Sequence, residues 1–341
     1  MTARPSVSVL IVAFGDDPEL DKCLAAVLGS TDVDVDIVVV DNGDRSGHLG
    51  ILEHDPRARV IRPDTNLGFA GGCNLAAEHA DGDVLALVNP DVIVAPGTLA
   101  QLAATCSAPE VGIATASLRL AAHPDIINSA GNPVHYLGLA WAGGHGEPAH
   151  QHASRTVVAS ASGACCAIRA VRWRELGGFD EAYFAYHEDV ELSLRCWQHG
   201  WAVVYVPSAI AFHHYDFSRH DLKTYLLERN RILTVLTTYS ARTLLWLTIP
   251  LLVQEVAMLA VAAIGGWFPA KVKGYLWIAG HLGHIWSRRQ LLQRERVLSD
   301  HDLAHLYAIT LDAGNVDTGA GVRFANRLST VGGHAFRRCA A

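Results

Sequence analysis

The stretch Asp36-Ile37-Val38-Val39-Val40-Asp41 decides the fold class, because it is a short apolar run that ends on a carboxylate. Consecutive β-branched residues are typical of a strand that is buried on both faces. Comparable runs occur at residues 7–12, 59–61 and 84–88, and stretches of helical pattern separate them. This alternation predicts an α/β domain in which helices flank a mostly parallel sheet.

The composition of the chain excludes several other classes of protein. Half of its 341 residues are hydrophobic and 18% are charged, which indicates a folded chain with a substantial core. The net charge of -7 gives no affinity for nucleic acid, and no nucleic-acid-binding motif occurs. Seven cysteines without a CxxC spacing indicate free thiols in a reducing cytosol. The first residues lack the pattern of a signal peptide, so we expect the catalytic part to stay in the cytoplasm.

Polar side chains follow several of the predicted strands. Asp41 ends one strand, and Asn89 and Asp91 come directly after the run at residues 84–88. Ligands of open α/β sheets bind beyond the carboxyl ends of the strands. A single Asp in such a place is more often a cap than a ligand, so the set is more informative than any member of it.

Sugar transfer from a nucleoside diphosphate needs chemical groups of this kind. The leaving diphosphate gains negative charge, which a divalent cation held by a carboxylate neutralises. The acceptor hydroxyl needs a carboxylate or a histidine to take its proton. Mg²⁺ and Mn²⁺ typically take one or two protein carboxylates and complete their shell with phosphate and water. Asp91 is therefore a candidate metal ligand, and His213 is a second one if Mn²⁺ is used.

Several motifs in a fixed order extend this hypothesis over residues 6–239. In chain order they are Ser6-Val7-Ser8-Val9-Leu10-Ile11-Val12-Ala13-Phe14, Val38-Val39-Val40-Asp41-Asn42, Asn66-Leu67-Gly68-Phe69-Ala70-Gly71-Gly72-Cys73-Asn74, Leu87-Val88-Asn89-Pro90-Asp91, Gly177-Gly178-Phe179-Asp180-Glu181, Tyr186-His187-Glu188-Asp189-Val190-Glu191-Leu192, residues 207–213, and Tyr225 with Arg229-Asn230. Together they resemble the family-two inverting glycosyltransferases with the GT-A fold, and within them the bacterial rhamnosyltransferase-like branch.

The resemblance implies a role for each matched residue. Asp189 would be the catalytic base beside Glu188, and Asp91 and His213 would hold Mg²⁺ or Mn²⁺. The nucleotide-sugar site would comprise Ala13, Phe14, Asp41, Asn66, Gly68, Phe69, Asn74, Asn89 and Asp91. Asn89 stands where the family usually has the first Asp of an Asp-x-Asp pair, which lowers the negative charge around the cation. The implied mechanism is a single displacement with inversion at the anomeric carbon.

The glycines of the third motif also suggest a dinucleotide-binding fold. That fold needs G-x-G-x-x-G directly after the first strand, which here ends in Ala13-Phe14-Gly15. An NAD enzyme or a methyltransferase is therefore a poor alternative. His214 alternates to the opposite face of its strand from His213, so we expect it outside the metal site.

The predicted function is transfer of L-rhamnose from dTDP-rhamnose onto a hydroxyl of a cell-envelope glycan or a polyprenyl-linked saccharide. One alternative is the same fold with a UDP-sugar donor, either galactofuranose or a hexose. Another is a nucleotide-sugar-binding protein without catalysis. The Gln-x-x-Arg-Trp motif of processive family members is absent, which favours single addition.

Three local expectations concern the less regular part of the domain. Residues 124–162 are rich in Gly, His and Pro and predict a long loop or flap. A helix is expected to follow the glycine pair at 71–72. A further helix is expected over residues 188–199, with Arg195 as a surface partner of Glu191.

The composition changes beyond residue 239, so we expect a glycosyltransferase domain over 1–239, an apolar and basic helical region over 240–300, and a tail over 301–341. Residues 244–268 are almost wholly apolar, with Glu255 in their middle. This region could span a bilayer, lie in its interface or cap the domain. A cluster of arginines follows it, at Arg288, Arg289, Arg294 and Arg296. Attraction of these arginines to anionic lipid favours peripheral attachment at the inner face of the cell membrane.

Overall fold

The computed structural model describes residues 4–52, 54–215 and 221–311, together with positions 330, 333 and 336. The chain divides into two compact units. The first unit consists of Met1–Asn132, Ala142–Cys196 and Trp201–Asp216. The second unit consists of Pro133–Trp141, Trp197–Gly200 and Phe217–Ala341.

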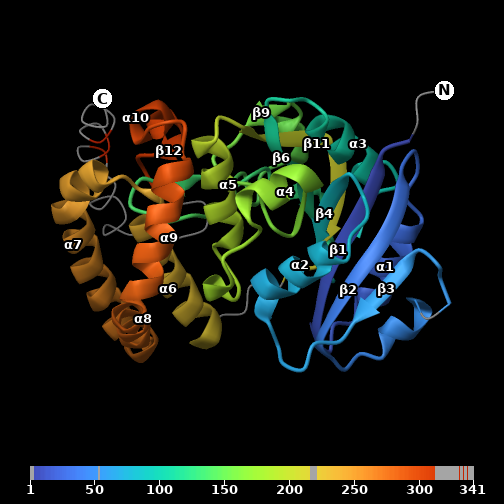
Figure 1. Cartoon of the computed structure of the whole chain (residues 1–341), viewed down its shortest axis with the longest axis horizontal. Helices are drawn as coiled ribbons and strands as arrows, with labels where there is room; N and C mark the ends of the chain where they lie inside the picture. The colour runs from blue at the N-terminus through green and yellow to red at the C-terminus, as the bar shows by residue number, and fades with distance from the viewer. Residues whose placement is uncertain are drawn as a thin grey trace. The chain divides into compact units, whose positions relative to one another are not determined.

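The first unit is built on one mixed, mostly parallel sheet (Figure 1). Its strand order is β3-β2-β1-β4-β10-β6-β11-β5, with β7 beside β6 and β9 beside β11. The strands are β1 Ser6–Gly15, β2 Asp34–Asp44, β3 Ala58–Ile61, β4 Val84–Val88, β5 Val92–Val94, β6 Val111–Leu120, β7 His123–Ser129, β9 Thr156–Val157, β10 Cys165–Arg169 and β11 Ala202–His213. The parallel pairs β3-β2, β2-β1, β1-β4 and β6-β11 give the α/β fold class that the sequence predicts.

Successive strand side chains point to opposite faces of this sheet, and they are apolar on both faces. Helices therefore cover both faces. Val9 and Ile11 of β1 join the core formed with α1 (Leu20–Leu28) and α3 (Thr98–Cys106). Val12 points the other way, toward α2 (Gly68–Glu78). A Cβ on Gly72 would lie 2.8 Å from the Val12 methyl groups, so glycine is what lets α2 lie close to the sheet.

Two local expectations need correction. The glycine pair at 71–72 lies inside α2, because the helix already begins at Gly68. Residues 124–162 are not one long loop: most of β7, which is hydrogen-bonded to β6, and the short strands β8 (Val134–His135) and β9 lie in this range. Gly and Pro in this range mark turns between short strands. The remaining helices of the first unit are α4 (Ala170–Leu176) and α5 (Glu188–Gln198), whose last two residues belong to the second unit.

The second unit is mainly helical. Its described elements are α6 Asp221–Thr238, α7 Ala241–Ile264, α8 Phe268–Gly280, α9 Leu282–Glu295 and α10 Asp300–Leu303, with β8 paired to β12 Tyr307–Ala308. This unit takes in all of α6, so it begins before residue 239, where the sequence suggested a boundary. Most of the tail expected over 301–341 lies outside the described residues.

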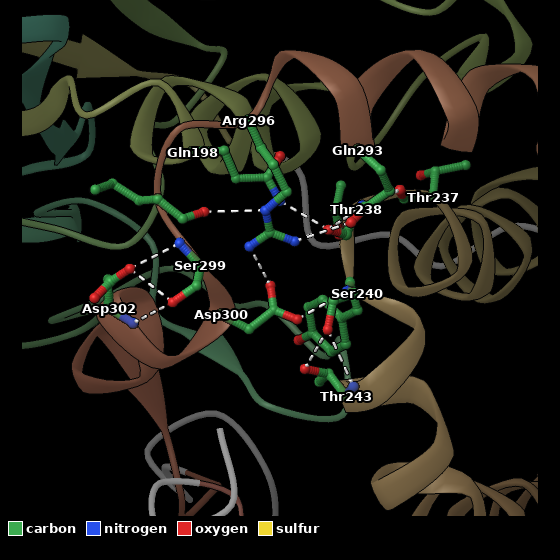
Figure 2. A network of polar contacts seen from close by, with 12 residues as sticks. Gln198, Thr237, Thr238, Ser240, Thr243, Gln293, Arg296, Ser299, Asp300 and Asp302 are labelled. Atoms are coloured by element: carbon green, nitrogen blue, oxygen red, sulfur yellow. Dashed lines mark hydrogen bonds and ion pairs between the residues drawn. The ribbon is translucent and has the colours of Figure 1, made fainter. Parts of the chain in front are cut away.

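A polar network fixes the corner between α6 and α7 (Figure 2). Ser240 caps α7 by accepting a hydrogen bond from the Thr243 amide at 3.1 Å, and its own amide donates to Asp300 at 2.8 Å. Arg296 forms an ion pair with Asp300 at 2.6 Å, and Gln293 donates to the Thr238 carbonyl at 3.1 Å. The direction in which α7 leaves the corner is therefore set by polar contacts.

Candidate active site

Asp91 and His213 meet at one end of the sheet. β5 pairs antiparallel with β11, which places His213 opposite Val92, and the Oδ2 atom of Asp91 lies 3.2 Å from Nε2 of His213. The other ring nitrogen, Nδ1, lies 2.8 Å from the amide oxygen of Asn128. Because that oxygen can only accept, Nδ1 donates to it, and Nε2 is the ring nitrogen that faces Asp91. Metal-binding histidines are commonly oriented in this way.

Two further oxygen atoms at this place fit a cation. Oδ1 of Asp91 and Oδ1 of Asn89 are buried and accept no hydrogen bond from the part of the chain that is described. A buried polar atom without a partner costs about 1–3 kcal/mol, which a bound cation would offset. One carboxylate, one imidazole and one amide oxygen suit Mn²⁺, and the oxygens also suit Mg²⁺. No group of three or more His, Cys, Asp or Glu residues that could hold a metal occurs among the described residues. A metal ion here would therefore need substrate oxygens as well.

Glu188 and Asp189 form a second acidic pair in the first turn of α5. The Asp189 carboxylate accepts hydrogen bonds from the backbone amides of Gly163 at 2.9 Å and Val190 at 2.8 Å. Oε2 of Glu188 is buried and has no hydrogen-bond partner within the described ranges. Burial raises the pKa of Asp189, and burial together with the Asp189 charge raises the pKa of Glu188 well above its ordinary value. The amide donors make Asp189 the ionised member of the pair.

The two acidic groups belong to one site. Gly163 donates to Asp189, and the carbonyl of the next residue, Ala164, accepts the Asn89 amide at 2.9 Å. Burial, and then the charges of Tyr215, Glu188 and Asp91, raise the pKa of the Tyr186 hydroxyl, so Tyr186 lies within electrostatic range of both groups. The structure therefore places the metal candidates and the base candidate at the same end of the sheet, as proteins with open α/β sheets do.

The loop that leads to this pair is strained. Phe184, Tyr186 and His187 all have positive φ, at 62°, 68° and 68°. Such a conformation costs roughly 1–3 kcal/mol for each residue that is not glycine and is typical of functional sites. The Phe184 carbonyl accepts a hydrogen bond from Ala70 at 3.0 Å, and a Cβ on Gly68 would overlap that carbonyl. Gly68 thus provides the space in which the loop before Asp189 is held.

Ala13, Phe14 and Asp41 lie together at the ends of neighbouring strands. Ala13 is buried and stands opposite Asp41 in the β1-β2 register, whereas the Phe14 ring is 62% exposed. Oδ1 of Asp41 accepts from the amides of the following turn, and Oδ2 lies 3.1 Å from Nε of Arg62. The carboxylate is held in one orientation beside an exposed aromatic ring, an arrangement that suits a planar base.

The remaining candidates of the third motif have different surroundings. Asn66 accepts from the Gly68 amide at 2.8 Å and so turns the chain into α2. Phe69 borders the base candidate, because a Cβ on Gly163 would lie 3.5 Å from the Phe69 ring and 3.4 Å from Asp189. The Asn74 amide bonds to the backbone N–H and carbonyl of Phe179. It ties α2 to the turn before α5.

Other features of the site were missed or misplaced in the sequence analysis. Asn128 fell within the range expected to be a loop, although the Ile126-Ile127 pair before it is compatible with a strand. Arg195 does pair with Glu191, but the pair is buried and not on the surface, because Arg195 also holds the Leu176 and Gly178 carbonyls. His214 lies 3.5 Å from Glu19.

The fold is that of the GT-A glycosyltransferases. The model of the family described as "Glycosyltransferase like family 2" matches residues 5–233, and the chain belongs to this family.

Two relatives illustrate the range of the family. N-acetylglucosaminyl-diphospho-decaprenol L-rhamnosyltransferase of Mycobacterium tuberculosis is 30% identical over 232 residues, which are 60% of this chain and 75% of the relative. O-antigen biosynthesis protein RfbC of Myxococcus xanthus is 31% identical over 230 residues, which are 63% of this chain but only 18% of the relative.

Solved structures support the fold independently. GalNAc-T7 with UDP, GalNAc and Mn²⁺ superposes with a TM-score of 0.58 at 18% identity, over 71% of this chain and 49% of that one. The mannosyltransferase PcManGT of Pyrobaculum calidifontis, with GDP-Man and Mn²⁺, gives a TM-score of 0.52 at 15% identity, over 99% and 86% of the two chains. These likenesses show the GT-A fold.

Proposed function

We propose that this glycosyltransferase moves L-rhamnose from dTDP-rhamnose onto a hydroxyl of a polyprenyl-linked saccharide or another glycan of the cell envelope. The observation that carries the proposal is the placing of Asp91, His213 and Asp189 at one end of the sheet. The mycobacterial rhamnosyltransferase, similar over most of its length, supports the choice of sugar and acceptor. The O-antigen protein supports a role in surface polysaccharide.

Asp91, His213 and Asn89 would hold Mg²⁺ or Mn²⁺ with their unshared oxygen and nitrogen lone pairs. When bound, the ion would neutralise the charge that develops on the leaving diphosphate. Asn128 keeps the His213 ring in the tautomer that exposes Nε2. Asp41 and Phe14 would bind the base, and Asn66, Gly68 and Phe69 would line the donor site.

Asp189 is the proposed catalytic base. Its carboxylate would accept the proton of the acceptor hydroxyl while the hydroxyl oxygen forms a bond to the anomeric carbon. The bond between that carbon and the diphosphate oxygen breaks on the opposite face, so the configuration inverts. The Gly163 and Val190 amides hold the carboxylate in place, which matters as much as its basicity. Glu188 would stay protonated and limit the negative charge beside the base.

The proposed location is the cytoplasm, peripheral on the inner face of the cell membrane, where a polyprenyl-linked acceptor would be available. One described helix, Ala241–Ile264, is long and apolar enough to cross a membrane, which by itself is weak evidence.

The test is a transfer assay with a polyprenyl-diphosphate N-acetylglucosamine acceptor and a panel of dTDP-rhamnose, UDP-galactofuranose and UDP-glucose. We expect turnover with dTDP-rhamnose in the presence of Mn²⁺ or Mg²⁺, and an inverted product configuration by NMR. Turnover with a UDP-sugar alone would keep the class of enzyme and replace the donor. Binding of a nucleotide sugar without turnover on any acceptor would support the non-catalytic alternative.

A further inference from the structure

The outer face of α7 is a continuous apolar surface. Leu245, Ile249, Leu252 and Val256 recur at spacings of three or four residues, and Val261 and Ile264 are also exposed. Leu245, Ile249 and Ile264 are 77%, 73% and 90% exposed. Only 11% of the most apolar 18-residue window of this helix is buried. No charged residue occurs between Thr243 and Ile264 except Glu255. The helix is therefore not a core helix of the second unit, because a core helix would be mostly covered.

The inner face of α7 carries Glu255, whose carboxylate forms ion pairs with two neighbouring helices. Oε2 of Glu255 lies 2.8 Å from Nζ of Lys271 on α8, and Oε1 forms an ion pair with Arg231 on α6. The Tyr275 hydroxyl donates to Glu255 at 2.6 Å, and Lys271 and Arg231 both also pair with Glu228 of α6. These contacts attach α7 to α6 and α8 at its midpoint.

This attachment argues against a helix that crosses the bilayer. Crossing would either pull Glu255 away from two buried cations or carry four charged side chains into hydrocarbon, and both are costly. A helix that lies in the interface keeps the charged face on the protein and offers the apolar face to the acyl boundary.

The charges around α7 indicate what kind of surface its exposed apolar face would contact. Residues 240–298 contain seven Arg and Lys against two Glu, in a chain whose net charge is -7, and one of the seven, Lys271, is buried and paired with Glu228 and Glu255. Two arginines of the cluster seen in the sequence are engaged internally: Arg289 donates to the carbonyls that end α6, and Arg296 pairs with Asp300. Arg242, Lys273 and Arg294 remain at the surface, and Trp246 is exposed beside Arg242. Basic residues and tryptophan flanking an apolar face are typical of helices at an anionic lipid surface.

We propose that α7 lies along the surface of an anionic lipid bilayer, with the Leu245–Ile264 face in the acyl boundary and the Glu255 face held by α6 and α8. This deepens the proposed function, because it assigns the membrane contact of the enzyme to one helix face. It does not depend on which sugar is transferred.

The experiment is flotation of the full chain with vesicles of phosphatidylcholine alone and with added phosphatidylglycerol. We expect at least tenfold more bound protein with the anionic vesicles, and release by 1 M salt or alkaline carbonate. Val256→Glu should reduce binding at least tenfold. Val171→Glu is the matched control, since Val171 is an exposed valine on a helix of the first unit, and it should bind as the wild type does. Circular dichroism would confirm that both variants fold.

Each other outcome overturns the proposal. Resistance to carbonate would mean that α7 spans the bilayer. A dimer in solution that Val256→Glu converts to a monomer, without vesicle binding, would mean that a second copy covers the face. Equal binding of Val256→Glu and wild type would place the contact elsewhere. Vesicle binding is measured without turnover, so it can succeed or fail independently of the assay for sugar transfer.

Discussion

The buried acids of the candidate site in the first unit and the buried acids of the second unit differ in their partners. In the second unit Glu228, Arg231, Glu255 and Lys271 are all ion-paired with one another. In the first unit Glu188 and Asp91 each have a buried oxygen without a hydrogen-bond partner among the residues described. The candidate site thus keeps buried acids at a cost in stability, whereas the acids of the second unit, like Glu191 beside Arg195 in the first, are compensated by cations.

This difference distinguishes buried charges that stabilise the fold from buried charges that are expected to bind a ligand or take part in catalysis. A buried charge whose partners are all protein groups holds helices together. A buried acid with an unpartnered oxygen is expected where a ligand supplies the partner, as it would at Asp91, or where the chemistry needs a perturbed pKa, as it would at Glu188 beside the proposed base. Variants of Asp91 and Asp189 should therefore mainly change activity and ligand binding, whereas variants of the paired charges in the second unit should mainly change stability.

The largest expected effect is loss of transfer in Asp189→Asn. Asn cannot accept the proton of the acceptor hydroxyl, and we expect kcat to fall about 10²–10⁴-fold, which is the contribution of a general base. Dissociation constants for the nucleotide should stay within twofold of the wild type in a calorimetric titration. Loss of nucleotide binding together with activity would instead mean that Asp189 is structural.

The next largest effect concerns the paired charges of the second unit. Lys271→Met leaves Arg231 as the cation that Glu228 and Glu255 share, so two buried carboxylates face one positive charge and we expect about 3–5 kcal/mol of lost stability. Chemical denaturation followed by circular dichroism measures this loss. Lys273→Met, two residues along the same helix at an exposed position, is the control and should change little. Equal effects of the two variants would show that the buried network contributes nothing specific.

A smaller effect should follow removal of the side chain that orients His213. Asn128→Ala leaves the ring free to turn, and we expect Mn²⁺ affinity to fall about 10–100-fold. Asn128→Asp keeps an acceptor for Nδ1 and should restore most of the affinity. Electron paramagnetic resonance of Mn²⁺ in the presence of the nucleotide would measure both. Unchanged affinity in Asn128→Ala would remove His213 from the proposed metal site.

The smallest effect should be a gain in stability in Glu188→Gln. The folded protein binds the Glu188 proton more tightly than the unfolded chain, because burial and Asp189 raise its pKa. Wild-type stability should therefore fall as the pH rises above the ordinary pKa of glutamate, and glutamine avoids this loss. We expect the melting temperature of the variant to exceed that of the wild type by a few degrees at pH 8 and to match it near pH 4. A variant that melts lower at pH 8 would contradict the raised pKa.

The sequence predicted the sheet and its ligand-binding end because both rest on local patterns. The buried run that ends on Asp41 and the one before Asn89 are strands β2 and β4, at the places the pattern indicated. What it could not predict depends on long-range pairing. Asn128 contacts His213 across 85 residues of chain, and Gly163 contacts Asp189 across 26, and neither spacing has a local signal. The partners of Glu255 could not be predicted either, because its cations lie on other helices.

The most direct test of the central claim is thermal stabilisation by dTDP, with and without Mn²⁺, in the wild type and in Asp91→Asn. A ligand at a hundred times its dissociation constant adds about 2.7 kcal/mol, which raises the melting temperature by several degrees. We predict this rise for the wild type with Mn²⁺ and its loss when either Mn²⁺ or the Asp91 carboxylate is removed. An equal rise in all four conditions would show that the unpartnered oxygens of Asp91 and Asn89 do not mark a metal-dependent nucleotide site.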